Sequence, residues 1–241
     1  MGIDSHDLDI AIDKMMGQKF AELFSGYLRT KGVHASSCGV IQSNPDRSKH
    51  LETATLSVNG QLVDFVNLRA EAYASHSRIP HSIGFGTPLE DALRRDITIN
   101  SLFYNIHTEA VEDFTEKGLN DLQCGTIRTP LTPKETLLDD PLRLLRVIRF
   151  ATRFQYAIVP DLLIAMKDHL VHKSLKDKVS RERVGIELDK ILSDRHALQG
   201  LFLVNEVDVF NIIFAVPEKM ERSPAEMSHD RIYLLFSLIE K

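Results

Sequence analysis

Two aspartates near the start of the chain lie two residues apart, in the segment Asp7-Leu8-Asp9. Residues 7–13 alternate between acidic or small and aliphatic side chains, which predicts a half-buried strand. Both carboxylates then lie on one face, close enough to share divalent cations. The alternative interpretation is an exposed strand face that happens to carry acid.

A third carboxylate comes from Asp64, in the otherwise apolar strand Val63-Asp64-Phe65-Val66. An aspartate in such a strand needs a compensating partner. Three carboxylates on two strands predict a site for two magnesium ions, which would activate a 3′-hydroxyl and stabilise a leaving pyrophosphate. The alternative is that Asp64 lies at a bulge or edge and reaches solvent.

A second polar group is the segment Arg94-Arg95-Asp96, followed by Asn100. If the segment is helical, Asp96 and Asn100 lie one turn apart and could hold ribose hydroxyls, while Arg94 and Arg95 reach phosphate oxygens. The competing interpretation is a hydrogen bond between Asp96 and Asn100, with both arginines exposed.

The third polar group begins at Asp140 and Arg143, three residues apart. A carboxylate beside a guanidinium matches the donor and acceptor on the pairing edges of cytosine and adenine, but not those of guanine and uracil. The pair therefore predicts selection of CTP and ATP, unless Asp140 is only a helix N-cap and Arg143 a surface ion-pair partner. Further arginines follow at helical steps, and we expect the first to contact nucleotide and the other two RNA: Arg146, Arg149 and Arg153.

The elements that position these residues form an α+β pattern, with a mixed or antiparallel sheet first and helices second. We expect strands at residues 7–13, 33–41, 54–58, 61–68, 111–114 and 126–128. Asn59-Gly60 predicts a hairpin turn, and residues 73–85 are expected to form a loop. A helix should begin at Thr87-Pro88 with a capping box to Glu90 and run to about Leu102. Another should begin with Asp140 as its N-cap, and others fit residues 160–170, 180–193 and 195–205.

Composition limits the classes of function. The 241 residues are 43% hydrophobic and carry a formal charge of −5, which argues against a protein that coats nucleic acid through a global positive field. The apolar runs are shorter than the ~18 residues of a membrane span. No secretory signal is evident, so we expect a soluble, cytoplasmic protein by default, with nuclear and organellar locations left open.

Taken together, these segments resemble the class II tRNA nucleotidyltransferases, the CCA-adding enzymes. Their motif sequences are most similar to those of the eukaryotic branch. The resemblance covers about residues 5–192, and the matching segments follow in the family's order: 5–9, 63–69, 94–100, 111–114, 139–153 and 180–185. It implies metal binding and catalysis at Asp7 and Asp9, with Asp64 as the third acid. It also implies a head (1–107), a neck with a nucleotide-templating helix (108–175) and a partial helical body (176–241), in which 180–185 is structural.

The implied reaction is template-independent addition of C, C and A to tRNA 3′ ends, using CTP, ATP and Mg²⁺. Two rivals remain open: a poly(A) polymerase of the same superfamily, and an RNA- or nucleotide-binding remnant without turnover. The family's glycine-rich strand before the Asp-x-Asp strand and most of its tRNA-gripping helical body are expected to be missing. We therefore expect a destabilised head unless another chain or segment supplies that strand. The sequence does not indicate an oligomeric state.

Overall fold

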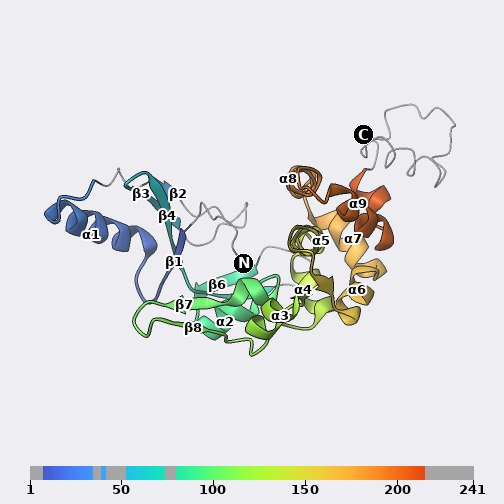
Figure 1. Cartoon of the computed structure of the whole chain (residues 1–241), viewed down its shortest axis with the longest axis horizontal. Coiled ribbons are helices and arrows are strands. Elements are labelled where there is room, and N and C mark those ends of the chain that lie inside the picture. The colour runs from blue at the N-terminus through green and yellow to red at the C-terminus, as the bar shows by residue number, and fades with distance from the viewer. Residues whose placement is uncertain (1–7, 35–38, 42–52, 74–79, 215–241) are drawn as a thin grey trace. The chain divides into compact units, whose positions relative to one another are not determined.

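The computed structural model describes residues 8–34, 39–41, 53–73 and 80–214 (Figure 1). The chain divides into two compact units, the first drawing on Met1–Arg95 and Ser101–Glu116 and the second on Asp96–Asn100 and Lys117–Lys241. The division falls inside the predicted head, since residues 96–100 belong to the second unit. The three predicted domains and their bounds stay a prediction.

The first unit is built on a four-stranded mixed sheet in the order β1-β4-β3-β2. The strands are β1 (Leu8–Ile12), β2 (Gly39–Ile41), β3 (Thr53–Val58) and β4 (Gln61–Asn67). β1 runs parallel to β4, and the other pairs are antiparallel. The predicted turn joins β3 to β4, with Asn59 and Gly60 both at positive φ (50° and 85°), as a type I′ hairpin requires.

One helix, α1 (Gly17–Thr30), packs against β3 and β4 (Figure 1). Phe20 and Phe24 meet the fully buried Phe65 of β4, with ring centroids 5.2 and 5.8 Å apart. Side chains alternate between the two faces of a strand, and the core side chains of β1 and β4 face α1. Their neighbours along each strand, including Asp9 and Asp64, therefore point away from α1. The predicted strands at 7–13, 54–58 and 61–68 are confirmed within one or two residues over their described parts.

The predicted loop at residues 73–85 is wrong where the structure describes it. β5 (Arg69–Tyr73) pairs with β6 (Pro80–Phe85) in an antiparallel hairpin that has a bulge between Ala72 and Tyr73. Pro80 stands at the first position of β6, where a strand tolerates a residue that cannot donate a backbone hydrogen bond. Proline therefore marked the start of a strand, and not a loop.

The helix that follows, α2 (Pro88–Leu93), has the predicted Thr87 N-cap and the full capping box with Glu90. It ends well before Leu102, which corrects that prediction. The Asp96 carboxylate accepts a hydrogen bond from the next backbone N–H, that of Ile97, and competes with a continued helix. A short 3₁₀ turn (Thr98–Ser101) and the hairpin of β7 (Phe103–Asn105) and β8 (Ala110–Glu112) follow.

The second unit is mainly helical. Its elements are α3 (Gly118–Cys124), β9 (Thr126–Ile127), α4 (Pro133–Asp139), α5 (Arg143–Phe154), β10 (Ala157–Ile158), α6 (Pro160–Met166), α7 (His169–Lys178), α8 (Arg181–Leu192), α9 (Ala197–Glu206) and α10 (Phe210–Ile213). The apolar face of α5 is buried, and Leu145 and Ile148 are completely covered. The α+β fold class is confirmed.

Asp140 is not the N-cap of α5, because that helix begins at Arg143 after a turn at Pro141-Leu142. The Asp140 carboxylate still accepts a hydrogen bond from the Leu142 backbone N–H at 3.2 Å. It therefore stabilises the Pro141-Leu142 turn that precedes the helix. Among the described residues, no helix is both long enough and apolar enough to cross a membrane.

Candidate active site

Two of the three predicted catalytic carboxylates lie side by side on the exposed face of the first sheet. Asp9 of β1 is the register partner of Asp64 of β4, and Asp64 is in turn the partner of Thr55 on β3. The Thr55 hydroxyl donates to Asp64 Oδ1 at 2.5 Å. Three strands therefore present a row of oxygen ligands away from α1, with one carboxylate held by a neighbouring hydroxyl.

This row suits a hard divalent cation, because carboxylate oxygens are the ligands such ions prefer. Asp9 and Asp64 would supply the ligands from the described part of the chain. The third predicted ligand, Asp7, lies outside the described residues. Within the described part, no cluster of three or more His, Cys, Asp or Glu side chains is arranged to hold a metal.

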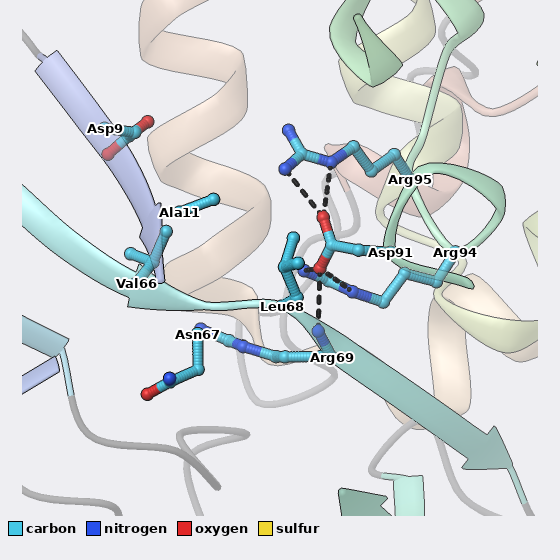
Figure 2. Close-up of a pocket in the computed structure, with 9 residues that line it drawn as sticks. All are labelled: Asp9, Ala11, Val66, Asn67, Leu68, Arg69, Asp91, Arg94 and Arg95. Carbon is cyan, nitrogen blue, oxygen red and sulfur yellow. Dashed lines mark hydrogen bonds and ion pairs between the residues drawn. The ribbon is translucent and has the colours of Figure 1, made fainter. Parts of the chain in front are cut away.

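A pocket of about 210 Å³ opens beside Asp9 (Figure 2). It is smaller than the ~300–1,000 Å³ typical of whole small-molecule sites, so it suits one part of a larger ligand. Asp9 and Ala11 line it from β1, residues 66–69 line it from the end of β4 and the start of β5, and Arg94 and Arg95 line it just after α2. The pocket thus brings the predicted metal ligand Asp9 together with the two predicted phosphate-binding arginines.

Asp91, which the sequence analysis did not single out, lies under both arginines. Its Oδ2 accepts from Arg95 Nε at 3.0 Å and Arg95 Nη2 at 2.7 Å. Its Oδ1 accepts from Arg94 Nε at 2.8 Å, from Arg94 Nη2, and from the backbone N–H of Arg69 at 3.1 Å. Burial raises the pKa of Asp91, but the charges of Arg94 and Arg95 and their hydrogen bonds outweigh it, so the pKa lies below its usual value.

Asn67, the last residue of β4, also lines this pocket and bonds to the segment that connects β1 to α1. Its buried side-chain amide donates to the Met15 carbonyl at 2.6 Å and the Ile12 carbonyl at 3.3 Å, and accepts from the Gly17 backbone N–H at 3.2 Å. It therefore ties the connection between β1 and α1 to the end of β4. A buried amide at a strand end carries no sequence signal that separates it from an exposed one.

In the second unit, Asp96, Asn100 and Arg146 meet although Arg146 is 50 residues from Asp96. Arg146 Nε donates to Asp96 Oδ2 at 2.7 Å, and Asn100 Nδ2 donates to Asp96 Oδ1 at 3.0 Å. Burial raises the Asp96 pKa, but Arg146 and the hydrogen bonds of Asn100 and Ile97 bring it below its usual value. The Asp96–Asn100 bond anticipated as the alternative is present, and ribose binding by these residues stays a prediction.

Asp140 is paired with Arg183, whose Nη2 donates to Asp140 Oδ2 at 3.0 Å. Arg143 is 93% buried and donates through Nη1 to the Thr136 carbonyl at 3.1 Å. Asp140, the acidic residue of the predicted templating pair, is thus bound by an arginine of α8. That arginine belongs to the segment 180–185, which was expected to be structural. Base selection by Asp140 and Arg143 stays a prediction.

The two arginines expected to contact RNA differ in their surroundings. Arg149 stacks over Phe150 at 4.1 Å and donates through Nε to the buried Glu187 at 2.7 Å. Burial lowers the pKa of Arg149 below its usual value, and the negative charge of Glu187, which raises that pKa, only partly offsets the effect of burial. Arg153, near the end of α5, is exposed. These contacts favour a packing role for Arg149, while the RNA-binding role of both arginines is untested.

Comparison with known proteins gives a consistent group of relatives. A family model described as the poly A polymerase head domain matches residues 1–128. The CCA tRNA nucleotidyltransferase, mitochondrial, of Saccharomyces cerevisiae is 51% identical over 218 residues, which are 89% of this chain and 40% of that protein. This chain therefore spans well under half the length of that relative.

Two solved structures resemble this chain. A CCA-adding enzyme in its apo form II aligns with a TM-score of 0.72 at 28% identity, over 88% of this chain and 47% of the other. A CCA-adding enzyme in complex with CTP aligns with a TM-score of 0.67 at 26% identity, over 88% and 44%. Because the family model matches more than half of the sequence, the chain belongs to the family described as the poly A polymerase head domain.

Proposed function

We propose that this chain carries the nucleotide-adding centre of a CCA-adding tRNA nucleotidyltransferase, which transfers C, C and A from CTP and ATP to tRNA 3′ ends. The observation that carries the proposal is the in-register pair Asp9 and Asp64, beside a pocket lined by Arg94 and Arg95. Carboxylates that hold divalent cations next to guanidiniums that hold phosphates are the parts of a nucleotidyl-transfer site.

The comparisons support the choice of substrates. The yeast relative is a CCA tRNA nucleotidyltransferase by name, and one structural neighbour was solved with CTP. Enzymes of this family use divalent metal ions, and Mg²⁺ is the ion proposed here. Bound at Asp7, Asp9 and Asp64, it would supply activation of the attacking 3′-hydroxyl and neutralise charge on the leaving pyrophosphate.

The protein's own residues have separate tasks in this proposal. Asp9 and Asp64 orient the metal-binding oxygens, and Arg94 and Arg95 orient the phosphates. In the second unit, Asp96 and Asn100 bind ribose, Arg146 contacts nucleotide, and Asp140 and Arg143 read the base edge. Arg149 and Arg153 remain the proposed contacts to the tRNA 3′ end.

The decisive test is incorporation of labelled CTP and ATP, with Mg²⁺, into tRNA lacking its CCA end. Asp9→Ala should abolish addition, whereas Asp13→Ala should leave it unchanged, because Asp13 is an exposed acid just past the end of β1 that pairs with the exposed Lys14. Equal activity of the two variants would contradict the proposed metal site. Failure of the unmodified, folded chain to bind Mg·CTP would contradict the function itself.

A poly(A) polymerase is the second candidate, favoured by the description of the matching family model. The same assay separates the two, because ATP alone would extend the primer by many adenosines in a poly(A) polymerase but by at most one after C-C in a CCA-adding enzyme. The cytoplasmic location stays a prediction, and the yeast relative is mitochondrial by name.

A further inference from the structure

The two arginines of the pocket are held by one buried carboxylate. The Asp91 side chain is 2% exposed, while those of Arg94 and Arg95 are 22% and 31% exposed. Each carboxylate oxygen serves one guanidinium, so a single residue divides its two acceptors between two adjacent cations. Figure 2 shows Asp91 between the two arginines, with the Arg95 guanidinium extending toward the strand that carries Asp9.

Adjacent like charges repel, and long basic side chains lose rotamer entropy when they are fixed. A buried anion that accepts from both arginines offsets these costs, and the three side chains together carry one net positive charge. Two guanidiniums fixed in this way are preorganised for a ligand with several anionic oxygens, because little reorganisation remains when it binds.

Asp91 also sets where the pair lies relative to the catalytic strands. Its Oδ1 accepts from the Arg69 backbone N–H, at the junction that follows β4 and its Asp64. A second tether is the Gly86 backbone N–H, which donates to the Leu68 carbonyl at 3.0 Å. One tether lies within α2 and the other just before it, so α2 is held to the segment that directly follows the strand of Asp64.

We propose that Asp91 is a positioning residue that presents Arg94 and Arg95 to the β- and γ-phosphates of the incoming nucleotide. The inference rests on the proposed function, since it assumes that this pocket receives a nucleoside triphosphate. It assigns Asp91 no contact with the substrate. Its effect should therefore fall on ligands that carry the terminal phosphates and spare those that lack them.

The experiment is calorimetric titration of the full chain with Mg·CTP and with CMP, comparing Asp91→Asn with Asp121→Asn. Asp121 is an equally buried aspartate, 1% exposed, whose arginine partner is Arg128 in the second unit. Both variants remove a buried charge next to arginine, so both should lower the unfolding temperature. Only Asp91→Asn should weaken Mg·CTP binding, by about tenfold as expected for loss of charge-assisted positioning, with CMP affinity changed less than about twofold.

Steady-state kinetics should show the same separation, with KM for CTP raised more than kcat is lowered in Asp91→Asn. If the variant is unfolded by circular dichroism, the single changes Arg94→Gln and Arg95→Gln replace it, since each leaves Asp91 one guanidinium partner. They too should weaken CTP and spare CMP.

Equal losses for CTP and CMP would mean that Asp91 only supports the pocket, and would overturn the inference. Unchanged CTP affinity in a folded Asp91→Asn protein would overturn it as well, while the proposed function stands. An unmodified chain that binds neither CTP nor CMP would instead defeat the proposed function, and the inference with it.

Discussion

At the scale of single residues, the Thr55 hydroxyl controls how Asp64 is presented. Thr55→Val keeps the shape of the side chain but removes the donor to Asp64 Oδ1. We expect the Mg²⁺ concentration for half-maximal activity to rise by about tenfold, or ~1.4 kcal/mol, with KM for CTP unchanged. The measurement is a magnesium titration of the incorporation rate.

Thr55→Ser supplies the matched rescue, because it restores the hydroxyl without the methyl group. Ser57→Ala provides a second control, since Ser57 lies on the same face of β3 but is the register partner of Leu62. A Thr55→Val enzyme with the magnesium dependence of the unmodified chain would show that the hydrogen bond has no role in metal binding.

At the scale of elements, the close approach of the segment before α2 to the start of β5 depends on a glycine. A Cβ on Gly86 would lie 2.4 Å from the Arg69 carbonyl carbon, so Gly86→Ala must displace the backbone that Asp91 also holds. We expect a loss of ~1–3 kcal/mol in the free energy of unfolding, as for other overpacked sites. Chemical denaturation followed by circular dichroism measures it.

Gly84→Ala is the matched control, because Gly84 lies on the neighbouring strand β6 with open space around its Cβ position. It should leave stability within ~0.5 kcal/mol of the unmodified chain. Equal stability of the two variants would show that the contact between Gly86 and Arg69 relaxes without cost.

At the scale of the whole molecule, each unit contains a buried aspartate whose pKa lies below its usual value: Asp91 in the first and Asp96 in the second. A depressed folded-state pKa contributes stability above the unfolded value of about 3.9, and this is lost as pH falls toward the folded value. We therefore expect the unfolding temperature to be nearly constant between about pH 5 and 7 and to drop below about pH 4.

Calorimetry across that pH range tests the expectation, and Asp91→Asn should show a shallower acid loss than the unmodified chain. The facing charges that sustain these shifts are Arg94 and Arg95 for Asp91 and Arg146 for Asp96. An identical acid profile in Asp91→Asn would mean that Asp91 contributes no pH-dependent stability.

The sequence alone determined the features that depend on local periodicity and on covalent geometry. Alternation in β1 and β4 placed Asp9 and Asp64 away from the apolar face, and Asn59-Gly60 and Thr87-Pro88 marked a turn and a helix start. These local features follow from steric preferences and hydrogen bonds within a few residues, so the amino-acid sequence is sufficient to predict them.

Tertiary structure alone decided which polar groups meet. Asp91 and its two arginines could have been suggested by their three- and four-residue spacing, but the tie to Arg69 depends on how α2 packs. Asp96 contacts Arg146 across 50 residues, and Asp140 contacts Arg183 across 43. A buried charge takes whichever partner the packing of distant elements brings near, because leaving it unpaired costs several kcal/mol, and no local pattern specifies that partner.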